Sequence, residues 1–513
     1  MPGPGDPPWG SPGRGCEDCA NSCGGNGFLE SCTAAGQKKL GNGGTQVRNL
    51  NMGISSTGVL DSVPDVTEKV AEETWPSIDG RAAKASVRQL VFTGPWFQRF
   101  MLLSVVFMPF QYALTLSVGF PLKISEILAV LGIGTYVLGR RSKPRRMDVA
   151  AGAALFLAVA TVLSAIVNLT PTESGLRAVG YERGFQTDLL LYSGYAFLAL
   201  SFWAVLRRVE RHKIVRATVL SIWLCGVAVL LQWASSITGN TFIIGLLGFR
   251  TLGVDGTVET LRSGPFLEGQ HLGFFAGAAI LVALYNRSYP AAVIAALCIL
   301  FSQSTTAYAG IAAGVALIVV LKFSKVVVPL IVAALVGVLV LLFSDSLRNT
   351  LGRQLAKIGF TEFAPDYQFA TSSLNQRGVK TEISFDMSRD NPLFGVGPGR
   401  YGAFFDQYVN GRQLPWIYST DQTRPIAENA YAHVAAELGY CALIAFCLLI
   451  LCLIWRNRRT SPVLVMVAIF VALGVATQSS WTFLPIWSVF GLLAADDREK
   501  EPEPGSPAAP ALG

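Results

Sequence analysis

The chain has 513 residues, of which 51% are hydrophobic and only 15% charged, and its formal net charge at pH 7 is +7. Together with a mean hydropathy of +0.44, this composition excludes an ordinary water-soluble domain. Apolar runs of about 18 or more residues recur along the chain, and each can cross a bilayer core of roughly 30 Å. The basic residues gather in short segments between these runs, where membrane orientation accounts for them, so no nucleic-acid binding is expected.

Residues 1–98 carry Gly, Pro, Ser and scattered charges without apolar periodicity, which is typical of a disordered tract. No apolar segment follows Met1, so no signal peptide is predicted. The segment CEDC places Cys16 and Cys19 in CxxC spacing with two more cysteines nearby, which is also a zinc-ligand pattern. Because almost no apolar residues surround this segment, a disordered cytoplasmic tract, or a start codon assigned too far upstream, is the favoured interpretation.

The next part of the chain, residues 99–495, is predicted to be an all-α polytopic transmembrane domain. Its twelve predicted spans lie at about 100–119, 121–138, 147–167, 185–206, 214–236, 265–285, 288–301, 305–322, 324–343, 430–455, 461–478 and 480–494. The loops GRRSKPRRMD, RRVERHKIVR, KFSK and WRNRR all fall on one side under this count, which marks that side as cytoplasmic. Both termini, including a tail at 496–513, are therefore expected in the cytoplasm, and the protein in the cell inner membrane.

The opposite, periplasmic face carries three notable loops, at about 168–184, 237–264 and 344–429. The third loop, between the ninth and tenth spans, is the main extramembrane feature of the chain. Connections longer than about 15 residues are usually functional or disordered. Since this loop is rich in Phe, Tyr, Trp and Arg, we expect it to fold on the membrane surface and to carry the chemistry.

Within that loop, the segment GVGPGRYG contains a literal GxGxxG at Gly397, Gly399 and Gly402. A dinucleotide site needs a strand before this motif and a helix after it, in a βαβ frame. A periplasmic loop does not supply that frame, so the glycines are predicted to form a tight turn with positive φ angles where needed.

Arginines are the stronger signal on this face, because the planar guanidinium fork matches phosphate oxygens and stays charged. The candidates in this part of the chain are Arg250, Arg262, Arg377, Arg389, Arg400, Arg412 and Arg424. A cluster beside the bilayer suits a lipid-linked diphosphate. The alternative for each arginine is an ion pair with the Asp and Glu residues of the loop itself.

The chain has three histidines, His212, His271 and His433. His212 lies in a basic loop and is interpreted as solvated. His271 follows Glu268 by three residues, which places both on one helical face and suggests a polar pocket at the membrane surface. No set of His, Cys and carboxylate residues has metal-ligand spacing, so neither a metal nor a cofactor is predicted.

Three segments, in order, resemble one family. RSGPFLEGQHLGFF resembles the motif that opens a middle span in bacterial O-antigen ligases and polysaccharide polymerases. QRGVKTEISFDMSRDNPLFGVGPGRYG resembles the family's Arg followed by a glycine-rich turn. ENAYAHVAAELGYCAL resembles the segment that closes the family's large periplasmic loop. The resemblance covers roughly residues 100–495 and implies a GT-C-like membrane glycosyltransferase.

Members of this family move a glycan from undecaprenyl diphosphate to an acceptor hydroxyl outside the cytoplasmic membrane, without nucleotide or metal. The resemblance implies that Arg262 and Arg377 contact the diphosphate. The positions that match the turn and the last segment are Gly395, Gly397, Gly399, Asn429, Tyr431, Glu437 and Gly439. The predicted substrate-binding residues are Arg250, Arg400, Arg424, His271, Glu268, Asn429, Tyr431 and His433.

One departure from the family pattern bears on the reaction. Ligases carry an essential His where this sequence has Glu428, and the family's SRG segment is altered to SQSTTAYAG at 302–310. Polymerase-like relatives often have an acidic residue at the position of the ligase His. The resemblance therefore favours a polymerase of exopolysaccharide or O-antigen type, with a ligase as the alternative. Glu428 is then the expected base for the incoming hydroxyl, while Arg262 and Arg377 stabilise the leaving diphosphate.

Two hypotheses from other classes stay open. Twelve spans also fit a secondary transporter or lipid flippase, although the polar residues gather in one loop rather than in repeated halves. Loss of the family His also fits a non-catalytic scaffold of an export complex. The expected partners of the polymerase are the lipid-linked oligosaccharide, a glycan acceptor and the bilayer, with a chain-length regulator or export complex as a further candidate.

Overall fold

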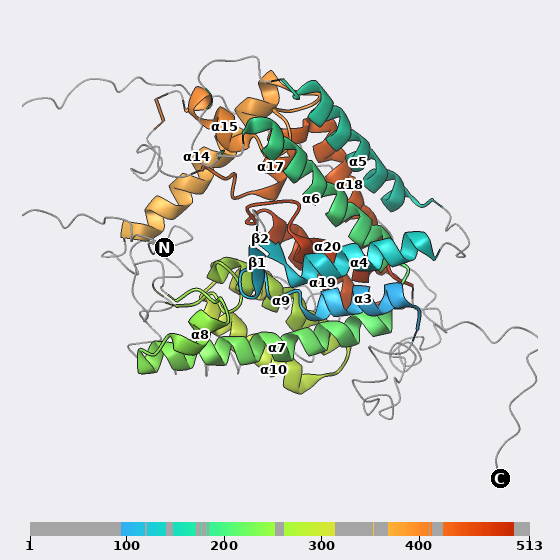
Figure 1. Ribbon diagram of the computed structural model, residues 1–513, viewed down its shortest axis with the longest axis vertical. Coiled ribbons are helices and arrows are strands. Elements are labelled where there is room, and N and C mark those ends of the chain that lie inside the picture. The colour runs from blue at the N-terminus through green and yellow to red at the C-terminus, as the bar shows by residue number, and fades with distance from the viewer. Residues whose placement is uncertain are drawn as a thin grey trace, which may run out of the picture. The chain divides into compact units, whose positions relative to one another are not determined.

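The computed structural model describes most of the chain from residue 94 onward (Figure 1). The described segments are 94–117, 121–139, 147–170, 184–251, 261–312, 368–409 and 424–496, with the single positions 176, 181, 352, 411 and 412. All of them belong to the unit Asp79–Gly513. The predicted tract at 1–98, apart from its last five residues, lies outside the described residues, as do the predicted span at 324–343 and the tail after 496.

Four helices in the described part of the chain are long and apolar enough to cross a membrane. They are α5 (Val149–Val167), α6 (Phe185–Leu206), α7 (Arg211–Thr238) and α18 (Tyr440–Asn457). The shorter apolar helices are α3 (Trp96–Val106), α4 (Ile124–Leu138), α9 (Gly269–Tyr285), α10 (Tyr289–Ser302), α19 (Pro462–Val475) and α20 (Leu484–Ala494). The chain is therefore a helical integral membrane protein, and the predicted spans at 147–167, 185–206 and 214–236 are confirmed as helices.

The first predicted span, at 100–119, is wrong in its second half. Helix α3 ends at Val106, and the chain then forms a short antiparallel pair, β1 (Thr115–Ser117) with β2 (Pro121–Lys123). Pro109 follows α3 closely and cannot donate a helical hydrogen bond, which accounts for the early end of the helix. A five-residue helix, α8 (Phe242–Leu246), packs near this hairpin, because Leu114 N donates to Leu247 O.

The predicted span at 430–455 is two helices, α17 (Ala430–Leu438) and α18, that meet at Gly439. Gly439 has φ +85°, and a Cβ atom there would lie 2.6 Å from Pro392 O. Only glycine accommodates both the left-handed backbone and this close approach. The break separates α17, which packs against α14 (Gln368–Asp390), from the membrane-spanning α18.

One end of the helix bundle, which we call the basic end, is fastened by ion pairs around Asp148. Arg207 Nη1 lies 3.1 Å from Asp148 Oδ1, and Arg456 Nη1 lies 3.5 Å from Asp148 Oδ2. Arg456 also pairs with Asp496, and Arg211 Nη2 donates to Ala495 O over 2.5 Å. The flanks of three of the predicted cytoplasmic loops therefore meet at one end of the bundle.

The opposite end, which we call the site end, carries the elements that precede α17. Helix α14, α15 (Tyr401–Phe404) and the 3₁₀ helix η3 (Phe405–Tyr408) lie together there, in orange in Figure 1. Their buried side chains form a separate apolar cluster that includes Ile383, Met387, Val396, Tyr401 and Phe405. At the end of α5, Ser164 Oγ lies 2.6 Å from Phe394 O and 2.8 Å from Glu437 O. The site end is thus attached directly to the end of a membrane helix.

Candidate functional site

Glu428 stands immediately before α17 in a strained backbone conformation. Its φ angle is +53°, a left-handed value that costs an L-residue roughly 1–2 kcal/mol. The next residue, Asn429, caps the helix, since its side-chain oxygen accepts from Tyr431 N at 3.1 Å and from Ala432 N at 3.3 Å. Strain of this kind persists only where the surrounding structure holds it, and it clusters at functional sites.

Two cations hold the Glu428 carboxylate. Arg377 Nε donates to Glu428 Oε2 over 3.0 Å, and Lys380 Nζ donates to Glu428 Oε1 over 2.5 Å. Both cations come from α14, three residues apart, and therefore from one face of that helix. The side chain of Lys380 is only 1% exposed, whereas those of Arg377 and Glu428 are 34% and 22% exposed. Arg377 and Glu428 are therefore open to a substrate, and Lys380 is not.

Arg377 also reaches the first turn of α9, because its Nη2 donates to Gln270 Oε1. Arg262 lies beside the same turn, since a Cβ atom at Gly269 would be only 3.2 Å from Arg262 Cγ. The Glu268 side chain makes no capping hydrogen bond to α9. The first N–H groups of a helix have no partner within it, and with the helix dipole they favour an anion. Arg262, Arg377 and the start of α9 together form a candidate anion site beside Glu428.

His271 lies next to this site but does not pair with Glu268 in the part of the chain that the structure describes. Its Nδ1 is 2.8 Å from Gln478 Oε1, on the segment between α19 and α20. Its ring packs against Phe483 at a centroid distance of 5.0 Å. The polar pocket at 268–271 stays a prediction; the contacts found there are those of His271 with Gln478 and of Gln270 with Arg377.

His433 and Tyr431, both predicted to bind substrate, have internal partners. His433 Nε2 lies 2.9 Å from Glu437 Oε1, and both side chains are buried. The same carboxylate oxygen accepts from Tyr401 N at 3.4 Å. Tyr431 donates its hydroxyl to Ala472 O over 2.8 Å. These contacts connect α17 to α15 and α19, and they give His433 a partner other than Glu428.

The segment 391–400, which we call the glycine turn, follows α14 directly. Gly395, Gly397 and Gly399 have φ angles of +61°, +100° and +72°, so the predicted turn with positive φ is confirmed. Val396 N donates to Ala436 O over 2.8 Å, and Gly397 N donates to Glu437 O over 3.1 Å. The glycines therefore let the turn lie against the last residues of α17.

Arg424, Arg400 and Arg250 lie apart from the Glu428 carboxylate, and no contact between them and Glu428 occurs among the described residues. Arg424 pairs with Asp188 at 3.0 Å, and its guanidinium lies over the rings of Tyr181 and Tyr192. Arg400 is 1% exposed, and burial lowers the pKa of its guanidinium. Arg250 Nη1 donates to Leu267 O over 3.3 Å.

The remaining two arginines of the loop form ion pairs with acids on α14. Arg389 lies 2.9 Å from Asp386, and Arg412 lies 2.6 Å from Asp386 and 3.5 Å from Glu382. The alternative interpretation, pairing with the loop's own acids, is therefore correct for Arg389 and Arg412. It also describes Arg377, whose partner Glu428 lies in the same loop, although Arg377 in addition contacts Gln270 of α9.

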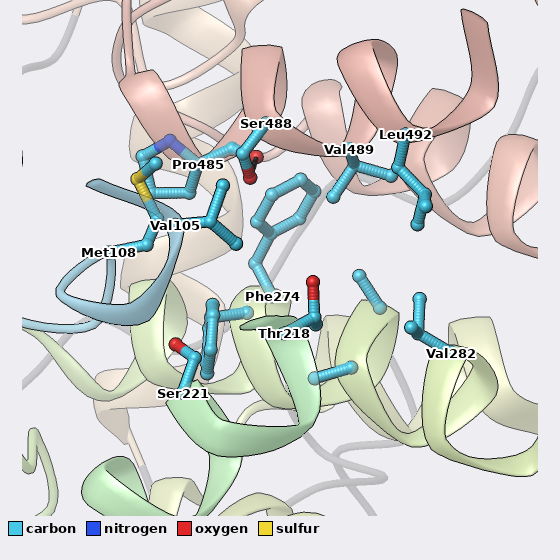
Figure 2. Close-up of a pocket in the computed structure, with 13 residues that line it drawn as sticks. Val105, Met108, Thr218, Ser221, Phe274, Val282, Pro485, Ser488, Val489 and Leu492 are labelled. Carbon is cyan, nitrogen blue, oxygen red and sulfur yellow. Dashed lines mark hydrogen bonds between the residues drawn. The ribbon is translucent and has the colours of Figure 1, made fainter. Parts of the chain in front are cut away.

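A cavity among the membrane helices carries no comparable chemistry. It lies between α3, α7, α9 and α20 and is lined mainly by apolar side chains such as Val105, Phe274 and Leu492 (Figure 2). The hydroxyls of Thr218 and Ser488 at its edge donate to backbone carbonyls of their own helices. No charged side chain lines it, so the candidate site is the one around Glu428.

Two members of the site, Lys380 and Gln270, were not singled out from the sequence. Lys380 stands three residues after Arg377, within the quoted segment QRGVKTEISF, so the helical spacing is the signal that points to it. Gln270 lies inside the quoted segment RSGPFLEGQHLGFF. Its role depends on the Arg377 side chain of α14 reaching the start of α9, which no local pattern predicts.

Comparison with known proteins places this site in context. Residues 290–447 match the family model described as O-antigen ligase. No curated protein matches the chain. The match includes Arg377, Lys380 and Glu428, and it confirms the resemblance to the O-antigen ligase and polymerase superfamily that the sequence motifs indicated. Arg262 and Gln270 lie before the matched segment.

Proposed function

We propose, with this family match as the premise, that the chain is a membrane glycosyltransferase of the polysaccharide polymerase type. It transfers a glycan from undecaprenyl diphosphate to a hydroxyl of another lipid-linked glycan, in exopolysaccharide or O-antigen synthesis. The observation that carries the proposal is the position of Arg377, which contacts both Glu428 and the first turn of α9. Arg377, the group proposed to bind the leaving diphosphate, is therefore next to Glu428, the proposed base for the nucleophile.

The donor diphosphate is expected at the start of α9. Arg262 and Arg377 supply guanidinium groups that match phosphate oxygens, and the N–H groups of Gly269 and Gln270 at the start of α9 are candidate further donors. These groups stabilise the negative charge that grows on the diphosphate as its bond to the anomeric carbon breaks.

The acceptor hydroxyl is expected beside Glu428. Its oxygen forms a bond to the anomeric carbon, the bond from that carbon to the diphosphate breaks, and the bonding electrons leave with the diphosphate. The hydroxyl proton passes to the Glu428 carboxylate. The 22% exposure of that carboxylate leaves it open to a hydroxyl, and its contacts with Arg377 and Lys380 hold it in place.

The location of the site supports a periplasmic reaction. Glu428 lies at the site end of the bundle, whereas the basic segments around Arg207 and Arg456 lie at the basic end. The excess of Arg and Lys marks cytoplasmic loops in membrane proteins. We therefore place the site on the periplasmic side of the inner membrane.

A ligase is the second candidate, because the matching family model is described as O-antigen ligase. Glu428 at the position of the ligase His favours the polymerase. The glycans of cells without the gene separate the two: single capped repeats indicate a lost polymerase, and unattached long chains indicate a lost ligase.

The catalytic assignment is tested by Glu428→Gln and Arg377→Ala in cells that lack the chromosomal gene, with glycan chain length read from gels. Arg389→Ala is the matched control, because Arg389 stands on the same helix and is 72% exposed. We expect loss of long chains from the two site variants and normal chains from the control. Full-length polymer from both site variants at normal protein level would overturn the assignment. Extension of a lipid-linked oligosaccharide by purified protein would exclude a transporter.

A further inference from the structure

Lys380 is the most deeply buried charge of the site. Its side chain is 1% exposed, and Ile383 and Met387 of the same helix are fully buried beside it. Lysine is almost never fully buried unless it is paired, because removal of an ammonium group from water is costly. The partner seen here is Glu428 Oε1, at 2.5 Å. Packing alone does not explain why a charged ammonium group is buried next to a glutamate with a strained backbone.

The backbone around Lys380 is also held in place. Its carbonyl oxygen accepts from Tyr401 Oη at 3.1 Å and from Ser384 Oγ at 2.8 Å. Tyr401 in turn donates its backbone N–H to Glu437, which belongs to α17. Lys380 is therefore fixed to the helix that begins directly after Glu428. The ammonium group and the carboxylate are held by one connected set of contacts.

The two cations on Glu428 differ in what else they face. Arg377 faces the start of α9 and is 34% exposed, so an incoming diphosphate competes with Glu428 for its guanidinium. Lys380 is too buried to reach a donor. When the diphosphate engages Arg377, the contact that Glu428 retains among the described residues is the one with Lys380, and this contact holds the carboxylate in its orientation.

We propose that Lys380 is a positioning residue of the transfer reaction. It acts through Glu428, because it holds the Oε1 atom of the carboxylate while Arg377 binds the diphosphate. The inference rests on the proposed function and adds a residue to that same site. Lys380 touches neither the glycan nor the diphosphate. Its effect is on the orientation of the base.

The test uses the purified full-length protein with a lipid-linked oligosaccharide, and it records the initial rate against donor concentration. In Lys380→Met we expect kcat to fall by on the order of tenfold to a hundredfold, within the range of general-base effects. Lys380→Arg should restore much of kcat, while KM for the donor stays near normal in both variants.

A double variant separates this role from a merely structural one. If Lys380 acts through Glu428, Lys380→Met should have almost no further effect on the residual rate in a Glu428→Gln background. A normal kcat in folded Lys380→Met, or an equal loss of rate in both backgrounds, would overturn the inference and leave the proposed function intact. A normal rate in Glu428→Gln, or no product from the unaltered protein, would overturn both.

Discussion

Arg377 Nε lies 3.0 Å from Glu428 Oε2, so the residue assigned to the leaving group and the residue assigned to the nucleophile are bonded to each other. The two roles require Arg377 to face phosphate oxygens and Glu428 to face a hydroxyl. Binding of the donor must therefore weaken this ion pair. In the structure, Arg377 and Glu428 are each other's partner.

Competition between Glu428 and the diphosphate leads to the first prediction. Glu428→Gln should bind undecaprenyl diphosphate several-fold more tightly than the unaltered protein, because the neutral amide competes less for Arg377, and transfer should still fall about 10²–10⁴-fold. Equilibrium binding in detergent and the rate of chain extension measure the two effects. Glu382→Gln, which removes an exposed partner of Arg412, is the control and should change neither. Weaker binding by Glu428→Gln would contradict the competition.

The pair formed by His433 and Glu437 gives a second prediction, which separates His433 from the base. Glu437→Leu removes the acceptor of two buried donors, and each unmet donor costs about 1–3 kcal/mol, so the melting temperature should fall. The double variant His433→Phe/Glu437→Leu should melt at a higher temperature than Glu437→Leu alone, because the buried imidazole is gone. It should also retain measurable transfer. Complete loss of transfer from a folded double variant would make His433 the stronger candidate for the base.

The glycine turn gives a third prediction with a matched control. A Cβ atom at Gly395 would lie 2.3 Å from the Glu437 carbonyl carbon, and the φ angle there is +61°. Gly395→Ala should therefore destabilise the fold by about 2–4 kcal/mol, from the sum of overpacking and backbone strain. Gly378, in α14, has no atom within 4 Å of its Cβ position, so Gly378→Ala should stabilise the fold by about 0.5–1 kcal/mol. Melting temperatures in one detergent compare the two, and an equal effect of both would contradict this account.

Asp148 at the basic end gives a fourth prediction, on pH. Partial burial raises the pKa of Asp148, but the hydrogen bond from Ala151 N and the charges of Arg207 and Arg456 outweigh it, so the pKa lies below its ordinary value. The carboxylate therefore stabilises the fold above about pH 4, and this contribution is lost as the pH falls through the lowered pKa. Asp148→Asn should melt at a lower temperature than the unaltered protein at pH 7. Its melting temperature should fall less than that of the unaltered protein when the pH is lowered.

The matched control for this experiment is Asp390→Asn, an exposed acid at the end of α14. Its melting temperature should equal that of the unaltered protein at every pH. If Asp148→Asn also follows the unaltered protein throughout, the ion pairs at the basic end contribute no measurable stability.

The orientation in the membrane gives a fifth prediction. In a background without other cysteines, Arg389→Cys at the site end should react in intact cells with a maleimide that reaches the periplasm but does not cross the inner membrane. Arg459→Cys at the basic end should react only after the membrane is permeabilised. Both side chains are exposed in the structure, so both are accessible to the reagent. The reverse pattern would place the site in the cytoplasm.

The long helices were predictable because their apolar runs are uninterrupted and as long as a bilayer is thick. Helix α6 begins and ends at the predicted residues, 185 and 206. The hairpin after α3 was missed because the residues around it remain as apolar as the predicted span. The break at Gly439 was missed for the same reason. Composition reports whether a segment suits a membrane but not where its backbone turns.

The sequence allowed most residues of the candidate site to be predicted, but not the contacts between them. Arg377 and Glu428 were identified through family motifs, but their mutual ion pair depends on how α14 packs against α17. Lys380 escaped notice because a lysine among Ile383 and Met387 resembles a surface residue until the helix is seen to be covered. Arg412 and Arg389 carry the same charge as Arg377, and only their acidic neighbours on α14 separate them from it.

The contacts of Ser164 bear on how the site responds to its surroundings. This hydroxyl, at the end of membrane helix α5, lies within hydrogen-bond reach of both Phe394 O and Glu437 O. The glycine turn and α17 are therefore attached to the tip of a helix that packs against α6 and α18. Bilayer thickness acts on helices of this kind through their tilt, within the limits that packing sets. Under the proposed function, we expect the transfer rate of the purified protein to depend on the chain length of the surrounding lipids.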